Sequence, residues 1–396
     1  MAAKPHMFIL YFYMVGMIFS GAGNGIATKI VDKTKFEGIP FHHPYFQSFA
    51  MFIAESLCIL VYFYELWDTK RKYGHYELSP DVIEAKRLGK STKISPLKFA
   101  IPMLCDAIGS TLQLFAYLYL QVSVAQMVQG SIVLVTAFLS IIFLRRALHR
   151  QHWTGLLFVI IGIALVGLAV IIAKDDSDED QPVVGLILMF CSILIQGGQF
   201  VIEEKFLGDY YLSPMKIVGW EGIWGVLLFL ILLPIFQFVP CSLDFCSESG
   251  VIEDTHFALR HLTNNYTALI LQIFGVLCMV GYNGFGITIT KHMSATSRTT
   301  LKQSKIILVW GFFLIYRGDG HESFKPTQLA GFVVLVLGIA LYNEILVLPF
   351  WGYNTNTTKA MEAKEKKVES LLSGMSNSNT LDDEQVYQTI NTKSVK

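Results

Sequence analysis

Charged residues are scarce in this sequence, and neither sign is in excess. Asp, Glu, Lys and Arg make up 16% of the 396 residues, whereas apolar residues make up 53%. The 31 Lys and Arg balance the 31 Asp and Glu, so no basic surplus indicates nucleic acid or another acidic partner. This composition is untypical of a soluble domain of this length, and it predicts an integral membrane protein.

Cysteine is also rare. Six cysteines in 396 residues are too few for a disulfide scaffold. Four of them fall within long apolar stretches, where we expect small core residues. They are Cys58, Cys105, Cys191 and Cys278. The 12 prolines and 31 glycines are too dispersed for a low-complexity or collagen-like chain.

Ten long apolar runs are present instead. A bilayer core about 30 Å thick requires roughly 20 apolar residues per helix. The runs begin near Met7, Tyr45, Leu97, Ala125, Trp153, Val183, Ile217, Tyr266, Ser297 and Gln328. Because the number is even, both termini are expected on one side. The first run is too long for a signal-peptide core and lacks a convincing cleavage site, so it is interpreted as a retained span.

The positive charges predict which side that is. Of the 31 Lys and Arg, 21 fall in connections on the side of the termini, 7 on the opposite side and 3 within the runs. Positive connections remain cytosolic, so both termini are predicted to be cytosolic.

A repeat of 176 residues relates the two halves of the chain. The sequence Gly-Ile-Ala-Leu occurs at 162–165 and again at 338–341, and Gly155 and Gly331 have the same separation. Five spans followed by five similar spans must be inverted relative to each other, an arrangement typical of secondary transporters. The sequence thus predicts an all-α integral membrane protein with ten transmembrane helices in a 5+5 inverted repeat. Its expected parts are a cytosolic head (1–6), the first half (7–174), the second half (183–348) and a disordered cytosolic tail (349–396).

Carboxylates lie within several runs. Glu55 and Asp106 are the eleventh and tenth residues of their runs, so both are expected near the midplane. An Asp at the centre of a span costs roughly 2.5–3.5 kcal/mol, so such groups normally face a cavity or a partner. Glu55, Asp106 and Glu221 are therefore candidates for proton coupling. The alternative is a protonated carboxyl group that is hydrogen-bonded to a neighbouring helix.

The ninth run reaches spanning length only if it includes three cations. Arg298, Lys302 and Lys305 have the spacing i, i+4, i+7 and share one helix face. One interpretation places them along a water-filled vestibule at the cytosolic mouth, where they attract an anionic group such as a phosphate. The other is snorkelling combined with ion pairs to Glu203, Glu204 or Glu221.

Amide and hydroxyl side chains within the runs provide further candidates for substrate binding. They are Gln126, Gln129, Gln199, Asn283 and Thr299. Such groups suit recognition of a sugar or a base, and they equally suit interhelical hydrogen bonds. Both interpretations stay open.

The longest connection on the predicted lumenal side contains Cys241 and Cys246. Oxidation is permitted there, so a local disulfide is a candidate alongside two free thiols. The sequon at Asn265 faces the same side but adjoins the next run, which disfavours glycosylation. Acidic residues at 175–180 fit no EF-hand spacing and are interpreted as a solvated loop.

The tail contains two short patterns of the sorting-signal type. Tyr387 and Ile390 form a tyrosine-based pattern, and Leu371 and Leu372 form a dileucine pattern without an acidic residue at its usual position. They predict adaptor proteins as partners of the tail and delivery to endosomes or lysosomes.

Several motifs in order resemble the drug/metabolite transporter superfamily and, within it, the solute carrier 35 family and its F branch. The resemblance covers residues 7–348. The motifs are Cys105-Asp106 with Gly109, Phe-Leu-Arg-Arg at 143–146, Gly-Ile-Ala-Leu-Val-Gly at 162–167, Glu-Glu-Lys-Phe at 203–206, and Thr290-Lys291 with Ser-Ala-Thr at 294–296. The motif at 203–206 is expected to follow the sixth span.

The resemblance implies the EamA-like fold of ten helices and an endomembrane location such as the lysosome, late endosome or Golgi. In nucleotide-sugar carriers of this family a lysine at the cytosolic end of the ninth helix meets the phosphate, a role that would fall to Lys302 or Lys305. The tyrosine and asparagine motifs with which those members recognise the nucleotide are not evident here. Position 129 is Gln where close relatives carry Arg, and Lys302 stands where an acidic residue is expected. The resemblance therefore does not fix the substrate.

The leading functional hypothesis is a secondary carrier of a small, polar, anionic metabolite. Alternatives are a proton-coupled exporter of cationic or amphipathic solutes and a non-transporting scaffold or receptor. Within the runs there is no Gly-x-Ser-x-Gly motif and no metal-binding pair of histidines, so an enzyme is not expected. The expected partners are a small-molecule substrate and the lipid bilayer, with a homodimer left open and no cofactor or metal.

Overall fold

The computed structural model is built almost entirely of helices. It describes residues 7–41, 43–75, 77, 79–119, 128–145, 148–172, 182–241, 246–247, 249–316, 326–349, 357, 360–361 and 363–364. In chain order the helices are α1 (Met7–Lys33), α2 (Pro44–Tyr73), α3 (Pro80–Arg87), the 3-10 helix η2 (Pro96–Phe99), α4 (Ala100–Tyr119), α6 (Ile132–Leu144), α7 (Arg150–Ile172), α8 (Pro182–Asp209), α9 (Pro214–Phe238), α10 (Thr255–Asn264), α11 (Tyr266–His292), α12 (Ala295–Ile315) and α13 (Pro326–Tyr342). Strands β1 (Lys35–Phe36) and β2 (Ile39–Pro40) pair antiparallel.

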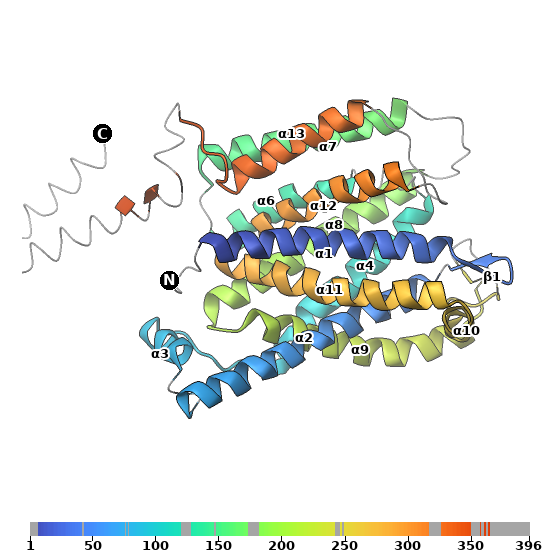
Figure 1. Ribbon diagram of the computed structural model, residues 1–396, viewed down its shortest axis with the longest axis horizontal. Helices are drawn as coiled ribbons and strands as arrows, with labels where there is room; N and C mark the ends of the chain where they lie inside the picture. Colours follow the sequence, from blue (N-terminus) through green and yellow to red (C-terminus); the bar gives the residue numbers. More distant parts are fainter. Residues whose placement is uncertain are drawn as a thin grey trace, which may run out of the picture.

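The long helices lie side by side along the long axis of the molecule (Figure 1). The β1–β2 hairpin and α10 lie at one end, which we call the α10 end, and α3 lies at the other, the α3 end. The beginning of α1 is at the α3 end. A helix satisfies its own backbone hydrogen bonds, which an apolar solvent cannot do, so long apolar runs fold in this way.

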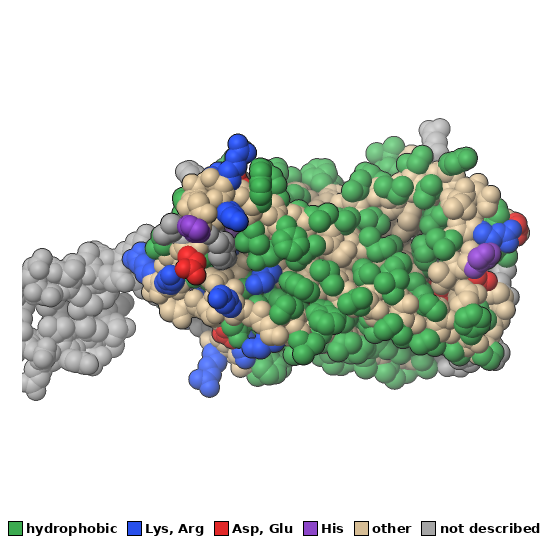
Figure 2. Space-filling model, turned by 90° about the horizontal axis from the view of Figure 1, so that it is seen from below, with side chains coloured by type: hydrophobic (Ala, Val, Ile, Leu, Met, Phe, Trp, Pro, Cys, Tyr) green, Lys and Arg blue, Asp and Glu red, His purple; other side chains and the backbone are tan. Residues whose placement is uncertain are grey.

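Length and composition identify this bundle as a multi-pass membrane protein. Among the described residues, five helices are long and apolar enough to cross a bilayer, namely α1, α2, α8, α9 and α11. Shorter apolar helices lie at 128–144, 150–165 and 329–342. Hydrophobic side chains cover the middle of the molecule, whereas Lys and Arg gather toward the α3 end (Figure 2).

Helices from the two halves of the sequence pack against each other in pairs. The most extensive pairs are α7 with α13, α1 with α11, α2 with α9, and α4 with α8. The hydrophobic core formed in this way includes Met17, Ile132, Val159, Met189 and Ile193, all of which are nearly inaccessible to solvent.

Glycines allow α7 and α13 to approach closely. A Cβ on Gly162 would lie 2.6 Å from the backbone nitrogen of Leu335, and a Cβ on Gly338 would lie 2.6 Å from that of Val159. Neither position has room for a side chain while the helices keep this separation. The close approach is the role of small residues in membrane helix pairs.

Two details differ from the expectations. Helix α8 continues to Asp209, so the motif at 203–206 lies inside the helix and not after it. Cys58 is buried, and Cys105 and Cys278 are partly buried, but Cys191 is exposed on the surface of the bundle. The expectation of a core residue is therefore wrong for Cys191, because the outer surface of a bilayer bundle is itself apolar.

We predict that Gly162→Ala destabilises the protein by about 1–3 kcal/mol, since overpacking forces the backbones of α7 and α13 apart. The measurement is the free energy of unfolding of purified protein in detergent. Gly198→Ala in α8 is the matched control, because a Cβ at that position meets no atom within 4 Å. Equal stability of the two variants would contradict the close packing.

Candidate functional site

The charged residues predicted from the sequence converge inside the bundle. Glu55 comes from α2, Asp106 from α4, Glu221 from α9, and the three cations from α12. Electrostatic interactions connect Glu55, Asp106 and Glu221 with Glu203 of α8 and with Arg298. We call this set of buried charges, together with Lys302 and Lys305, the central polar cluster.

Glu55 is held by helix α11. The side-chain nitrogen Nδ2 of Asn283 donates a hydrogen bond of 2.8 Å to Oε1 of Glu55, and both side chains are buried. The other carboxylate oxygen, Oε2, has no hydrogen-bond partner among the described residues. Oε1 of Glu221, on the neighbouring helix α9, is likewise buried without a partner there.

Arg298 forms a buried ion pair with Glu203. Nη1 of Arg298 donates to Oε2 of Glu203, and the two side chains are 7% and 1% exposed. Gln199, one turn before Glu203 in α8, donates a hydrogen bond of 3.1 Å to its Oε1. The guanidinium carbon of Arg298 also lies 4.6 Å from the centroid of the Phe200 ring, within the range of a cation–π contact.

Lys302 and Lys305 face aromatic rings of other helices. Nζ of Lys302 lies 5.5 Å from the Phe200 ring centroid, and Nζ of Lys305 lies 4.9 Å from that of Tyr282 in α11. A Cβ on Gly21 of α1 would lie 3.2 Å from Cδ of Lys305. The stripe on α12 is thus directed toward α8, α11 and α1, inside the bundle, and not toward lipid.

Asp106 and Glu203 interact with the same amide side chain, that of Gln199. Its carboxylate forms a hydrogen bond with the side chain of Gln199 and interacts electrostatically with Lys302 and Arg298. Gln199 therefore connects the carboxylates of α4 and α8.

The remaining amide and hydroxyl candidates differ in their positions and partners. Thr299 is fully buried and shares a hydrogen bond of 2.9 Å with Thr136 of α6, which is an interhelical contact. Asn283 is engaged with Glu55, as described above. Gln129 precedes α6 and interacts with other residues, whereas Gln126 lies outside the described residues.

One residue of the central polar cluster and two aromatic residues beside it were not singled out as candidates from the sequence. Glu203 appeared there only as one possible ion-pair partner, and Phe200 and Tyr282 were not considered. Two adjacent glutamates, Glu203 and Glu204, at the end of an apolar run are the feature of the sequence that could have identified Glu203 as a candidate. Aromatic residues are common in such runs, so no signal marked the other two.

A second polar cluster is buried at the α10 end. Nδ1 of His43 lies 2.7 Å from Oε1 of Glu253, and Oε2 of Glu253 accepts a hydrogen bond of 3.0 Å from the backbone of Tyr45. Nε2 of His261 lies 3.1 Å from the hydroxyl of Thr34. These contacts join the chain between α1 and α2 to the connection between α9 and α11.

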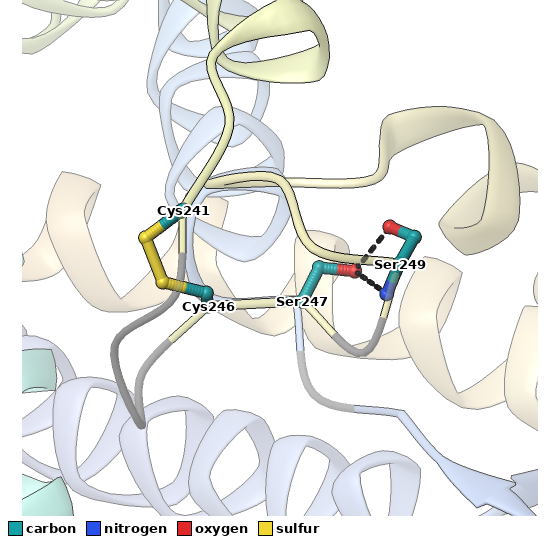
Figure 3. Close-up of a disulfide and its surroundings, with 4 residues drawn as sticks. All are labelled: Cys241, Cys246, Ser247 and Ser249. Carbon is teal, nitrogen blue, oxygen red and sulfur yellow. Dashed lines mark hydrogen bonds between the residues drawn. A yellow bond between two sulfur atoms is a disulfide. The ribbon is translucent and has the colours of Figure 1, made fainter.

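The same end contains the two cysteines of the long connection. Cys241 and Cys246 are joined by a disulfide, next to Ser247 and Ser249 (Figure 3). Asn265 caps the first turn of α11, because its Oδ1 accepts a hydrogen bond from the backbone of Ala268.

The tail residues Leu371, Leu372, Tyr387 and Ile390 lie outside the described residues. Within the part of the chain that is described, no group of three His, Cys, Asp or Glu is arranged to hold a metal ion.

Comparison with known proteins agrees with this picture. A family model of nucleotide-sugar transporters matches residues 11–214. Human solute carrier family 35 member F6 is 31% identical over 83% of this chain and 87% of its own length. A UDP-N-acetylglucosamine/UDP-N-acetylgalactosamine transporter of Caenorhabditis elegans is 30% identical over 31% of this chain and 36% of its own. A crystal structure with 12% sequence identity matches 86% of this chain and 98% of its own with a TM-score of 0.55, a likeness of fold alone.

A helical, multi-pass bundle with buried charges and these relatives defines a membrane transporter. The chain belongs to the solute carrier 35 family, in its F branch. The resemblance seen in the sequence is thereby confirmed, and membership of a transporter family places the protein outside the enzymes.

We predict that Glu203→Gln lowers the free energy of unfolding by about 3–5 kcal/mol, because Arg298 is left as a buried charge without its carboxylate. The double variant Glu203→Leu with Arg298→Leu is expected to recover part of this loss, since neither charge remains. Thermal or detergent-induced unfolding of the purified proteins measures both. A double variant less stable than the single one would contradict the pairing.

The α10 end gives a prediction about pH. Burial and the nearby His43 lower the pKa of His261 below its usual 6.5. Protonation therefore favours the unfolded chain, and the contribution of His261 to stability is lost as the pH falls below about 6.5. The unfolding temperature of the wild type should fall more between pH 7.5 and pH 5 than that of His261→Gln. His256→Gln, at an exposed position of the same helix, is the control and should behave like the wild type.

Proposed function

We propose that the protein is a secondary carrier that moves a small anionic metabolite across an endomembrane by alternating access. The observation that supports this is the inward direction of the α12 cations. Lys302 and Lys305 face the rings of Phe200 and Tyr282 inside the bundle, where a phosphate or carboxylate on a substrate would meet them. Rings beside cations also suit the flat base of a nucleotide, and the Caenorhabditis elegans relative is named as a transporter of UDP-linked sugars.

We propose further that ten helices form two inverted halves, 7–174 and 183–348, around this cluster. The helix packing supports a two-fold relation with the 176-residue offset. Under it, the pair α1–α11 corresponds to α8–α4, and both pairs are extensive. The contacts of Gly162 with Leu335 and of Gly338 with Val159 are related by the same offset in each member.

The orientation belongs to the same proposal. Lys and Arg gather at the α3 end (Figure 2), which supports a cytosolic α3 end with both termini on that side. The disulfide between Cys241 and Cys246 at the opposite end supports an oxidising, lumenal compartment there. The sorting patterns at Leu371-Leu372 and Tyr387–Ile390 favour the lysosomal or late endosomal membrane over the Golgi.

One observation favours proton coupling as a second candidate function. Glu55 and Glu221 each keep a buried carboxylate oxygen without a hydrogen-bond partner among the described residues. No described donor occupies such an oxygen, so it is free of the hydrogen bond that would hold the carboxyl group in its ionised form, and it can carry the proton of the neutral form. This supports either proton-coupled transport of the anion or export of a cationic solute from an acidic lumen.

We predict that Lys305→Gln reduces transport of the anionic substrate about tenfold or more, since a charge-assisted hydrogen bond is lost. The assay is exchange in liposomes that contain the purified protein, with panels of nucleotide sugars, sugar phosphates and organic cations, each with and without a pH gradient. Lys205→Gln, which removes an exposed cation of α8, is the control and should transport like the wild type.

The cationic panel separates the two functions. Transport of cations that requires the pH gradient and is lost in Glu55→Gln would overturn the anion carrier in favour of the exporter. Absence of any exchange, together with an unchanged cellular phenotype of a Glu55→Gln, Asp106→Asn and Lys305→Gln triple variant, would favour a scaffold.

A further inference from the structure

Two buried carboxylates of the central polar cluster lie where helices α2 and α9 touch. Gly222 follows Glu221 in α9, and a Cβ on it would lie 2.5 Å from the backbone carbonyl carbon of Glu55 in α2. The side chains of Glu55 and Glu221 are 5% and 3% exposed, and their charges act on each other. Like charges buried together repel each other strongly unless a positive group offsets them. This crossing therefore forms a negative pole, and we call Glu55 and Glu221 the carboxylate pair.

Each member of the carboxylate pair has one oxygen that is not satisfied by the described residues. Oε1 of Glu55 accepts a hydrogen bond from Asn283, but Oε2 of Glu55 and Oε1 of Glu221 have no hydrogen-bond partner there. A proton alone would turn such an oxygen into a buried O–H donor that still lacks an acceptor. Both oxygens are better satisfied by a ligand that brings donors and positive charge together.

Tyr282 connects this pole with the lysines of α12. It precedes Asn283, the partner of Glu55, in α11, and its ring centroid lies 4.9 Å from Nζ of Lys305. The Tyr282 hydroxyl is also buried without a hydrogen-bond partner in the described part of the chain, and it interacts electrostatically with charges of the central polar cluster. Unpartnered polar atoms from α2, α9 and α11 thus meet at one cluster. Buried polar groups normally have partners, so this combination indicates a ligand site.

The charges of the central polar cluster do not balance. Among the described residues it contains four carboxylates and three cations. Arg298 is ion-paired with Glu203. Asp106 interacts with Lys302. The carboxylate pair then stands against the single charge of Lys305, so the negative sign is in excess. A simple anion that binds Lys305 adds to this excess, whereas an anion that also carries an ammonium group offsets it.

We propose that the transported anion also carries an ammonium group, which binds the carboxylate pair while the phosphate or carboxylate of the same molecule binds Lys302 and Lys305. The proposal rests on the proposed function, because it names the substrate class of the same site. An ammonium group has three donors and a positive charge, so it satisfies both unpartnered oxygens at once. A metal ion fits less well, because no group of three His, Cys, Asp or Glu in the described ranges is arranged to hold one.

The test compares ligands that differ only in the ammonium group. The unfolding temperature of the purified full-length protein in detergent is measured against increasing aminoethyl, aminobutyl and aminohexyl phosphate, against the alkyl phosphates of the same lengths, and against the matching alkylamines. The concentration that gives half of the stabilisation reports affinity and does not depend on transport. At least one aminoalkyl phosphate is expected to bind about tenfold or more tightly than its alkyl phosphate, since charge-assisted hydrogen bonds to two carboxylates are gained.

Substitution of either carboxylate is expected to change the two ligands in opposite directions. In Glu221→Gln and in Glu55→Gln the aminoalkyl phosphate binds more weakly because a carboxylate is lost, and the alkyl phosphate binds more tightly because a repelling charge is gone. A variant that is merely misfolded would bind both ligands more weakly. Lys305→Gln weakens both, since both carry the phosphate. Glu65→Gln, the same change at an exposed position of α2, keeps the wild-type preference.

The outcomes separate this inference from the carrier itself. If the wild type binds aminoalkyl and alkyl phosphates equally, the ammonium site is overturned and the anion carrier stands. The same conclusion follows if the preference survives in both Glu55→Gln and Glu221→Gln. If the alkylamines bind as tightly as the aminoalkyl phosphates, the anion carrier is overturned, and the substrate with two charges falls with it. A wild type that none of these ligands stabilises overturns both proposals.

Discussion

A charge inside a bilayer bundle must find a partner there, and the arrangement of the central helices follows from this constraint. Removing an ion from water costs several kcal/mol, which an opposite charge and good hydrogen bonds must offset. The pair of Arg298 and Glu203 meets this condition, with Gln199 donating to the carboxylate. It joins α8 to α12 and thereby fixes where Lys302 and Lys305 point.

The same constraint explains what the sequence could predict of the fold. Long apolar runs must become helices in lipid, and helices of the structure fall within every predicted run. The 176-residue offset predicted a relation between Gly162 and Gly338, and both lie at the α7–α13 crossing. The end of α8 was not predictable from composition, because the charges of Glu203 and Glu204 resemble the end of a span, whereas in the structure Glu203 has Arg298 as a partner inside the bundle and α8 continues to Asp209. The predicted core position of Cys191 was wrong because an apolar residue is equally stable in the core and against lipid.

The site was predictable in part for a related reason. Single charges in apolar runs are conspicuous, so Glu55, Asp106 and the three α12 cations stood out. The pairings were not predictable to the same degree, because Asn283 lies 228 residues from Glu55 and Glu203 lies 95 residues from Arg298. Asn283 was a candidate without an assigned partner, and Glu203 was one of three possible partners of the cations. Folding alone brings such pairs together, and the aromatic platforms beside the lysines have no distinguishing feature in the sequence.

The chemistry of the cations suggests a division of roles along α12. A guanidinium group is planar and offers several donors in fixed directions, which suits a permanent pair such as Arg298 with Glu203. An ammonium group is compact, sits on a flexible stem and can change partners at little geometric cost. Lys302 and Lys305 lie against rings, in contacts weaker than the ion pair. One cation of the stripe therefore holds two helices together, while the other two can exchange partners without breaking that ion pair. The arginine is nearest the start of α12 and the lysines follow one and two turns later, so the fixed and the exchangeable cations occupy successive turns of one helix face.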